Sequence, residues 1–184
     1  MYKLVEWNDK LDLSSFYKEA TEKGFYNNSS QKTMIECFHN EHKWNAWILY
    51  QDDIAIGSVA AHSFDDVMGQ NSYRVLTRCC ILRGARNGGG MMTANVAIGQ
   101  HQNLTDQFLL PQCIEWAGNN VYATSNESKI ASQRFVHRTY FPTLEKIGVV
   151  KKVKDIFYRG TDQTVWKINV DLFYENLNRY PRWI

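Results

Sequence analysis

Arg83-Gly84-Ala85-Arg86-Asn87-Gly88-Gly89-Gly90 is the stretch from which the organisation of this chain is read. It holds four of the eleven glycines, two arginines and no acidic residue. It directly follows Ser72–Leu82, the most strand-like run in the sequence. Glycine permits positive φ and close backbone approach, and arginine donates forked hydrogen bonds. A strand ending in such a turn is therefore able to present N–H groups to an anion. The alternative is a long, solvated hairpin loop.

The segments around this turn alternate between strand and helix patterns. Strands are expected at Tyr2–Trp7, Trp44–Tyr50, Ile54–Ser63, Ser72–Leu82, Val121–Ser125, Asp155–Arg159 and Thr164–Val170. Helices are expected at Asp12–Lys23, Gln31–His42, Met91–Gln100, Thr105–Ala117 and Ser128–Tyr140. Pro111 is expected to kink or break its helix, and Pro142 to terminate the last one. The order predicts an α/β (α+β) fold with a mixed, mostly antiparallel central sheet flanked by helices.

The composition predicts one folded domain over residues 1–184, with 171–184 as an aromatic tail packed on it. Hydrophobic residues make up 44% and aromatic residues 14%, enough for a packed core, and the net charge is only +2. The sequence does not decide the oligomeric state, including whether the chain forms a homodimer.

The cysteines and the N-terminal segment predict a reduced, cytoplasmic protein. No apolar run is long enough for a membrane span, and the first residues do not resemble a signal peptide. A metal site is not expected, because the cluster of Cys37, His39 and His42 lacks a fourth ligand.

The order of elements is similar to that of the GCN5-related N-acetyltransferase (GNAT) family. The family's pyrophosphate-binding turn follows its fourth strand with the pattern Gln/Arg-x-x-Gly-x-Gly/Ala. The nearest match here is Arg86–Met91, whose first and fourth positions fit and whose last position holds Met91. Further on, the family has a strand followed by an asparagine and a helix; here these correspond to Val121–Ser125, Asn126 and the helix after it.

The resemblance implies an enzyme that moves an acetyl group from acetyl-CoA, as co-substrate, to an amine of a small molecule or protein. It implies that the strand end would hold the pantetheine arm and that the turn and the asparagine would bind the rest of the cofactor. These cofactor-binding candidates are Cys80, Ile81, Leu82, Arg83, Arg86, Asn87, Gly88, Gly89, Gly90 and Asn126. It also places the acceptor region near Phe25–Glu41.

Three side chains are candidates for the proton transfers. His62 and Asp65 stand at the end of a strand beside the expected cleft, where a base could take the amine proton, often through water. The alternative for them is a polar turn capped by aspartate. Tyr140 is the candidate general acid, although Phe135 occupies the position where the family usually has its tyrosine.

Two other functions stay open at this point. One is a catalytically inactive binding protein on the same scaffold, which would use the aromatic tail Phe173–Trp183. The other is nucleic-acid binding through Arg74, Arg78, Arg83 and Arg86, against which the nearly balanced net charge argues.

Overall fold

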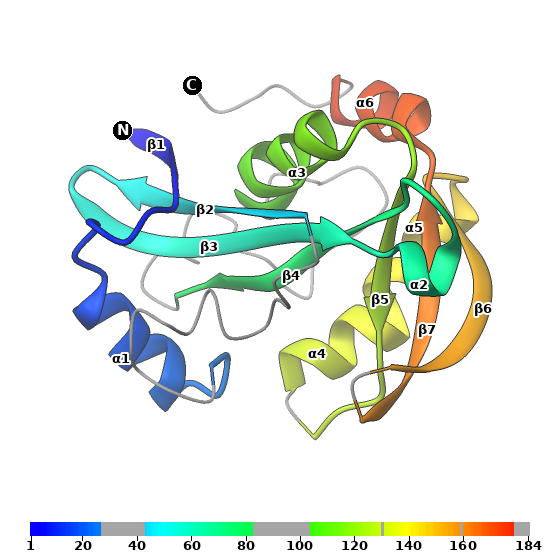
Figure 1. Cartoon of the computed structure of the whole chain (residues 1–184), viewed down its shortest axis with the longest axis horizontal. Coiled ribbons are helices and arrows are strands. Elements are labelled where there is room, and N and C mark those ends of the chain that lie inside the picture. The colour runs from blue at the N-terminus through cyan, green and yellow to red at the C-terminus, as the bar shows by residue number, and fades with distance from the viewer. Residues whose placement is uncertain (27–42, 83–103, 130, 159, 179–184) are drawn as a thin grey trace.

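The computed structural model describes residues 1–26, 43–82, 104–129, 131–158 and 160–178. Figure 1 shows the elements along the chain. The strands are β1 (Tyr2–Glu6), β2 (Trp44–Gln51), β3 (Ile54–Ser63), β4 (Tyr73–Ile81), β5 (Val121–Ser125), β6 (Val150–Tyr158) and β7 (Thr161–Ile168). The helices are α1 (Ser14–Glu22), α2 (Asp65–Met68), α3 (Leu110–Ala117), α4 (Ala131–Phe135), α5 (Phe141–Lys146) and α6 (Val170–Asn178), with π-helical segments η3 (Thr105–Leu109) and η4 (Val136–Tyr140).

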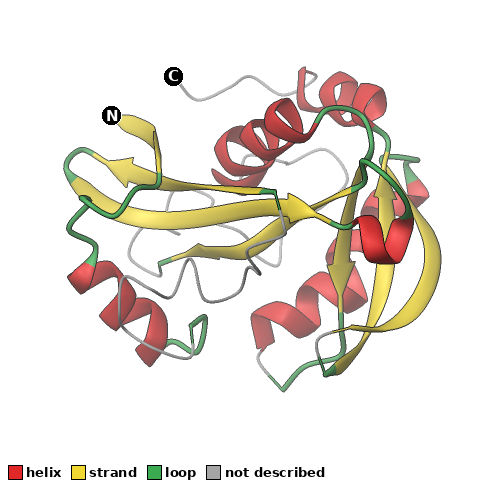
Figure 2. Ribbon diagram, in the orientation of Figure 1, coloured by secondary structure: helices red, strands yellow, loops and turns green. Residues whose placement is uncertain are grey.

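The strands form a seven-stranded sheet in the order β1-β2-β3-β4-β5-β7-β6. β4 and β5 run parallel, and every other neighbouring pair is antiparallel. Helices lie on both sides of the strands (Figure 2). The predicted mixed, mostly antiparallel sheet flanked by helices is therefore confirmed. The predicted helices at Gln31–His42 and Met91–Gln100 lie outside the described residues, as does the cluster of Cys37, His39 and His42.

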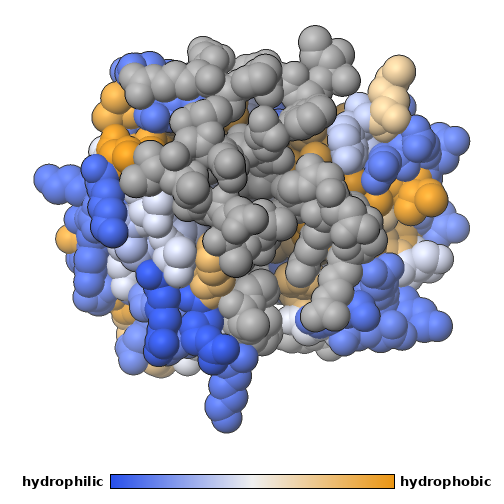
Figure 3. Space-filling model, turned by 180° about the vertical axis from the view of Figure 1, so that it is seen from behind, coloured by the Kyte–Doolittle hydropathy of each residue, from blue (hydrophilic) through white to orange (hydrophobic). Residues whose placement is uncertain are grey.

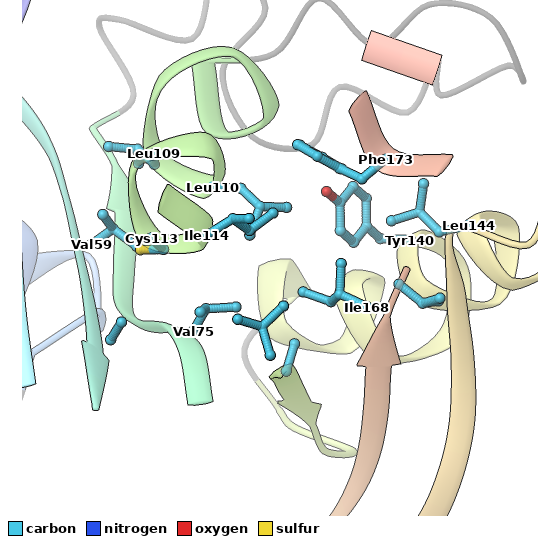
Figure 4. Packing of buried hydrophobic residues seen from close by; sticks show 14 of the residues in the cluster. Val59, Val75, Leu109, Leu110, Cys113, Ile114, Tyr140, Leu144, Ile168 and Phe173 are labelled. Atoms are coloured by element: carbon cyan, nitrogen blue, oxygen red, sulfur yellow. The ribbon is translucent and has the colours of Figure 1, made fainter. Parts of the chain in front are cut away.

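Two hydrophobic clusters define the two faces of the sheet. On what we call the α1 face, α1 packs through Phe16, Tyr17 and Ala20, together with strand residues such as Ala60 and Cys80. The larger cluster covers the opposite side, the α3 face, and is shown in part in Figure 4. It joins side chains of η3, α3, η4, α5 and α6 to strand residues such as Val59, Ala61 and Val75.

The helix predicted over Ser128–Tyr140 does not end at Pro142, and that prediction was wrong. The helical path continues through α5 to Lys146. A proline lacks an N–H and clashes with the carbonyl four residues back in a regular helix. Here the preceding turn is π-helical, with the Phe141 N–H bonded to the Val136 carbonyl, so Pro142 falls in the first turn of a new α-helix. Pro111 follows η3 in the same way, which is the break expected there.

The strand expected at Asp155–Arg159 begins earlier, at Val150, and ends at Tyr158. β7 begins at Thr161, three residues before the expected start at Thr164. Tyr158 pairs with Thr161, so only two residues separate the strands. The described residues contain no helix that is long and apolar enough to span a membrane. Seen from behind, the described part of the surface shows hydrophobic side chains in small areas among hydrophilic ones (Figure 3).

Candidate functional site

The two parallel strands at the centre of the sheet separate soon after they meet. β4 and β5 pair at Tyr73 with Val121 and at Arg74 with Tyr122. β4 then continues to Ile81 along β3, while β5 continues to Ser125 along β7. The two strands diverge in Figure 1 from this point. An open V between two central strands favours the enzyme hypothesis over the inactive binding protein.

β4 is irregular within the splay. Its register against β3 shifts twice, between Ser58 and Ala60 and between Ala60 and His62. Leu76 and Arg78 have φ of 59° and 51°, in the left-handed region. Neither is a glycine, so each left-handed turn is strained and must be held by its surroundings. Such bulges re-aim side chains and backbone groups and occur often beside active sites.

The bulges change which side chains share a face. Thr77 lies opposite Ala60, whose side chain packs on the α1 face. The next residue, Arg78, also reaches the α1 face, because its guanidinium carbon lies 5.4 Å from the ring centroid of Tyr26. Leu76 packs against the α3-face cluster instead. Regular alternation along this strand would have placed Leu76 and Arg78 on one face.

Three polar groups hold the bulge on the α1 face. The Ser58 hydroxyl donates to the Arg78 carbonyl at 2.8 Å, and the Tyr26 hydroxyl lies 2.5 Å from the Ser58 oxygen. The Tyr26 hydroxyl also donates to the same carbonyl at 3.4 Å. Burial raises the pKa of Tyr26 well above its usual value, so the hydroxyl stays protonated. This pairing satisfies a carbonyl that the bulge takes out of the regular ladder.

The α3 face of the same region holds a buried tyrosine–carboxylate pair. Tyr140, at the end of η4, donates to Asp106 Oδ1 in η3 at 2.5 Å. The two residues are 4% and 3% exposed. Figure 4 shows Tyr140 among the side chains between α3 and α6. Burial first, and then the Asp106 charge, raise the pKa of Tyr140 far above its usual value. The single proton of this hydroxyl is committed to Asp106.

A small pocket opens beside this pair. Its empty volume is about 290 Å³, counting the solvent at its mouth. Five apolar side chains and the Asn176 amide line it together with the tyrosine and the carboxylate. The lining residues are Asp106, Tyr140, Leu144, Ile147, Val149, Phe173, Asn176 and Leu177.

The structure does not bring the three predicted catalytic side chains together. His62 is fully buried in β3, and its Nδ1 lies 2.6 Å from the Ser63 carbonyl, so Nδ1 carries the proton. Asp65 is exposed at the start of α2, and its Oδ1 accepts the Ser72 N–H at 3.0 Å. Tyr140 lies on the α3 face, whereas alternation from Ala60 places His62 on the α1 face.

The described cofactor-binding candidates stand at the ends of the two splayed strands. Cys80, Ile81 and Leu82 are buried, and the Leu82 N–H donates to the Ile56 carbonyl at 2.8 Å. Asn126 is half-buried and directly follows β5. The other candidates lie outside the described residues: Arg83, Arg86, Asn87, Gly88, Gly89 and Gly90.

A hydrogen-bonded group fixes the end of β5 just before Asn126. The Ser125 hydroxyl accepts from Trp166 Nε1 of β7 at 2.9 Å and lies 3.0 Å from His137 Nδ1 of η4. The indole N–H can only donate, so the Ser125 oxygen is its acceptor. The Ser125 hydroxyl makes its second hydrogen bond with the imidazole of His137. β5, β7 and η4 are thereby joined at one point.

Sequence reasoning missed the groups that shape the splay. Ser58 and Tyr26 carry no motif, and a serine in an apolar strand signals only a buried hydroxyl in need of a partner. Asp106 and Tyr140 are 34 residues apart, so no local pattern joins them. From the sequence, Arg78 was considered as one of four arginines that could bind nucleic acid.

Solved structures of other proteins share the fold of this chain, although comparisons of sequence found no relative. No family model matches the chain, and no curated protein matches it in sequence. A solved structure of a GNAT-family protein from Desulfovibrio desulfuricans is similar with a TM-score of 0.57 at 11% identity, covering 90% of this chain and 97% of the other.

Two further solved structures have the same architecture. One is an acyl-CoA N-acyltransferase from Pseudomonas aeruginosa, with a TM-score of 0.52 at 10% identity, covering 92% of this chain and 99% of the other. The second is a GNAT family acetyltransferase from Elizabethkingia anophelis with acetyl-CoA bound, with a TM-score of 0.50 at 12% identity, covering 92% and 98%. The chain has the fold of the GNAT acyl-CoA N-acyltransferases.

Proposed function

We propose that this protein is an acyl-CoA-dependent N-acyltransferase, which moves an acetyl group from acetyl-CoA to an amine. The observation that carries the proposal is the splay of β4 from β5 after two paired residues, with both left-handed bulges of β4 inside it. The similar Elizabethkingia structure, which holds acetyl-CoA on the same fold, supports the choice of cofactor.

In the proposed reaction the amine nitrogen attacks the thioester carbonyl carbon, the C–S bond breaks, and the proton lost by nitrogen is balanced by the one gained by the thiolate. Backbone N–H groups of the bulged strand would polarise the carbonyl oxygen. Cys80, Ile81 and Leu82 would line the pantetheine arm, with Arg83, Arg86 and Asn87–Gly90 on the pyrophosphate and Asn126 on the opposite strand.

The catalytic roles of His62, Asp65 and Tyr140 remain part of the proposal. Either His62 or Asp65 would accept the amine proton through water. Tyr140 would protonate the thiolate only after its hydroxyl leaves Asp106, because a phenol has one proton to donate. A Tyr140→Phe enzyme that keeps its turnover number would remove Tyr140 from the mechanism.

The proposal is tested by calorimetric titration of the full chain with acetyl-CoA. Saturable binding with one site per chain is expected. Arg86→Ala, a change in the predicted anion-binding turn, should weaken that binding roughly ten- to a hundredfold without lowering the melting temperature. Absence of both heat and thermal stabilisation with acetyl-CoA would refute the proposal. Binding without release of free thiol in the presence of amines would favour the inactive binding protein instead.

A further inference from the structure

The guanidinium of Arg78 carries a positive charge that no described acidic residue neutralises. Arg78 is half-buried, and its guanidinium lies over the face of the Tyr26 ring. A cation over an aromatic ring is held by the ring's electrons and keeps its N–H groups for other acceptors. Within the described parts of the chain, no side chain or backbone oxygen accepts a hydrogen bond from this guanidinium.

The support beneath Arg78 is rigid. Tyr26 is 2% exposed, and its hydroxyl is fixed by Ser58 and by the Arg78 carbonyl. Its ring also makes edge contacts with Phe16 and Tyr17 of α1. Because the ring is fixed, the guanidinium that lies on it is already ordered. It therefore loses little conformational entropy when it binds an anion, and this favours binding.

One neighbouring group on the same face adds to the site. Thr77 is 7% exposed, and among the described residues its buried hydroxyl has no hydrogen-bond partner. It lies opposite Ala60, whose side chain packs on the α1 face. A hydroxyl donor and the guanidinium of Arg78 therefore both face the α1 side of β4.

We propose that this α1 face of the β4 bulges binds the oxyanion of the acceptor, so that the amine acceptor carries a carboxylate or a phosphate. The inference rests on the proposed acyl transfer, because that reaction is what makes the bound molecule an amine acceptor. Arg78 donates a forked pair of hydrogen bonds to the oxyanion, and Thr77 adds a third donor. The bulge at Arg78 belongs to the strand whose backbone N–H groups would polarise the thioester carbonyl, so the bound anion would hold the amine close to the thioester.

Position along the strand separates this site from the cofactor's own anions. Arg78 is four residues before Leu82, and the predicted pyrophosphate-binding residues follow Leu82 in the sequence. At about 3.3 Å per residue of strand, Leu82 itself lies roughly 13 Å beyond Arg78. The pyrophosphate site and the acceptor site are therefore predicted to respond to different substitutions.

The direct test is calorimetry on the full chain with matched pairs of amines, in the presence of CoA. Each of the common L-amino acids is compared with its carboxamide, and phosphoethanolamine with ethanolamine. Binding of at least one anionic member, roughly tenfold tighter than its neutral partner, is expected. The two kinds of pair show whether the oxyanion is a carboxylate or a phosphate. Equal affinity within every pair, or no binding of any anionic member, would overturn the inference.

Two variants locate the effect at Arg78. Arg78→Gln should abolish the preference for the anionic member and leave the dissociation constant of acetyl-CoA unchanged, whereas Arg78→Lys should retain part of the preference. The control is Arg138→Gln, which removes an exposed arginine paired with Glu127. A preference that survives Arg78→Gln would overturn the assignment. If the wild-type chain distinguishes the amines but acetyl-CoA does not bind, the proposed acyl transfer fails while the oxyanion site stands.

Discussion

The two faces of the sheet differ in how their polar groups are paired where β4 leaves β5. On the α3 face, Tyr140 and Asp106 satisfy one another in a buried contact. On the α1 face, Tyr26 and Ser58 satisfy the Arg78 carbonyl, while the guanidinium of the same residue rests on a ring. A closed pair contributes mainly to stability, whereas a supported cation keeps its hydrogen-bonding capacity for a ligand.

The largest expected effect comes from breaking the closed pair. Tyr140→Phe removes the donor to a carboxylate that is 3% exposed, and leaving a buried charge without that donor is costly. The free energy of unfolding should fall by about 3 kcal/mol, measured by urea denaturation. Tyr122→Phe is the matched control, because its hydroxyl makes no hydrogen bond to the described residues; it should cost less than about 0.5 kcal/mol. Similar losses in the two variants would show that the Tyr140–Asp106 contact is not stabilising.

A smaller effect depends on pH and belongs to the α1 face. Burial, partly offset by the hydrogen bond from Trp7, raises the pKa of Tyr17 from 10.0 to about 12. The folded state therefore favours the neutral form of Tyr17. The contribution of this residue to the free energy of unfolding is complete below pH 10 and is lost as the pH rises through about 12. The wild type should lose about 2 kcal/mol more than Tyr17→Phe between these limits, as judged by urea denaturation at each pH. Parallel pH profiles for the two proteins would contradict this assignment.

The smallest effect is expected from Tyr26→Phe. The ring beneath Arg78 is kept, and Ser58 still donates to the Arg78 carbonyl at 2.8 Å. Loss of the phenol should therefore cost about 1 kcal/mol in unfolding free energy. The preference for an anionic amine should survive in this variant, since the cation and its supporting ring remain. If Tyr26→Phe lowers the unfolding free energy as much as Tyr140→Phe does, the polar groups of the two faces contribute equally to stability. That result would contradict the proposed difference between the faces.

The regular parts of the sheet were predictable because they follow simple patterns. β3 and β5 have the limits expected from their apolar runs and their flanking polar turns. The end of the helix expected over Ser128–Tyr140 was mispredicted, because a local rule for Pro142 does not include the π-helical turn that accommodates it. That turn is fixed by packing in the cluster of the α3 face, which includes Tyr140 and Phe141.

The candidate site was predictable only in part. The position of the splay follows from the order of elements, and Cys80–Leu82 and Asn126 do lie at the ends of its strands. The bulges were invisible in the sequence, because Leu76 and Arg78 adopt left-handed conformations without a glycine to signal them. The contacts of Arg78 with Tyr26 and of Tyr140 with Asp106 join segments far apart in the chain, so only tertiary structure reveals them.

Amide hydrogen exchange with and without acetyl-CoA tests the central claim, that the splay between β4 and β5 is the acyl-CoA site. Slower exchange is predicted in peptides covering the bulged part of β4 and the residues after it, and at the end of β5. The β1–β2 ladder at the edge of the sheet should be unchanged and serves as the internal control. Protection spread evenly over the sheet, or confined to strands other than β4 and β5, would contradict the account.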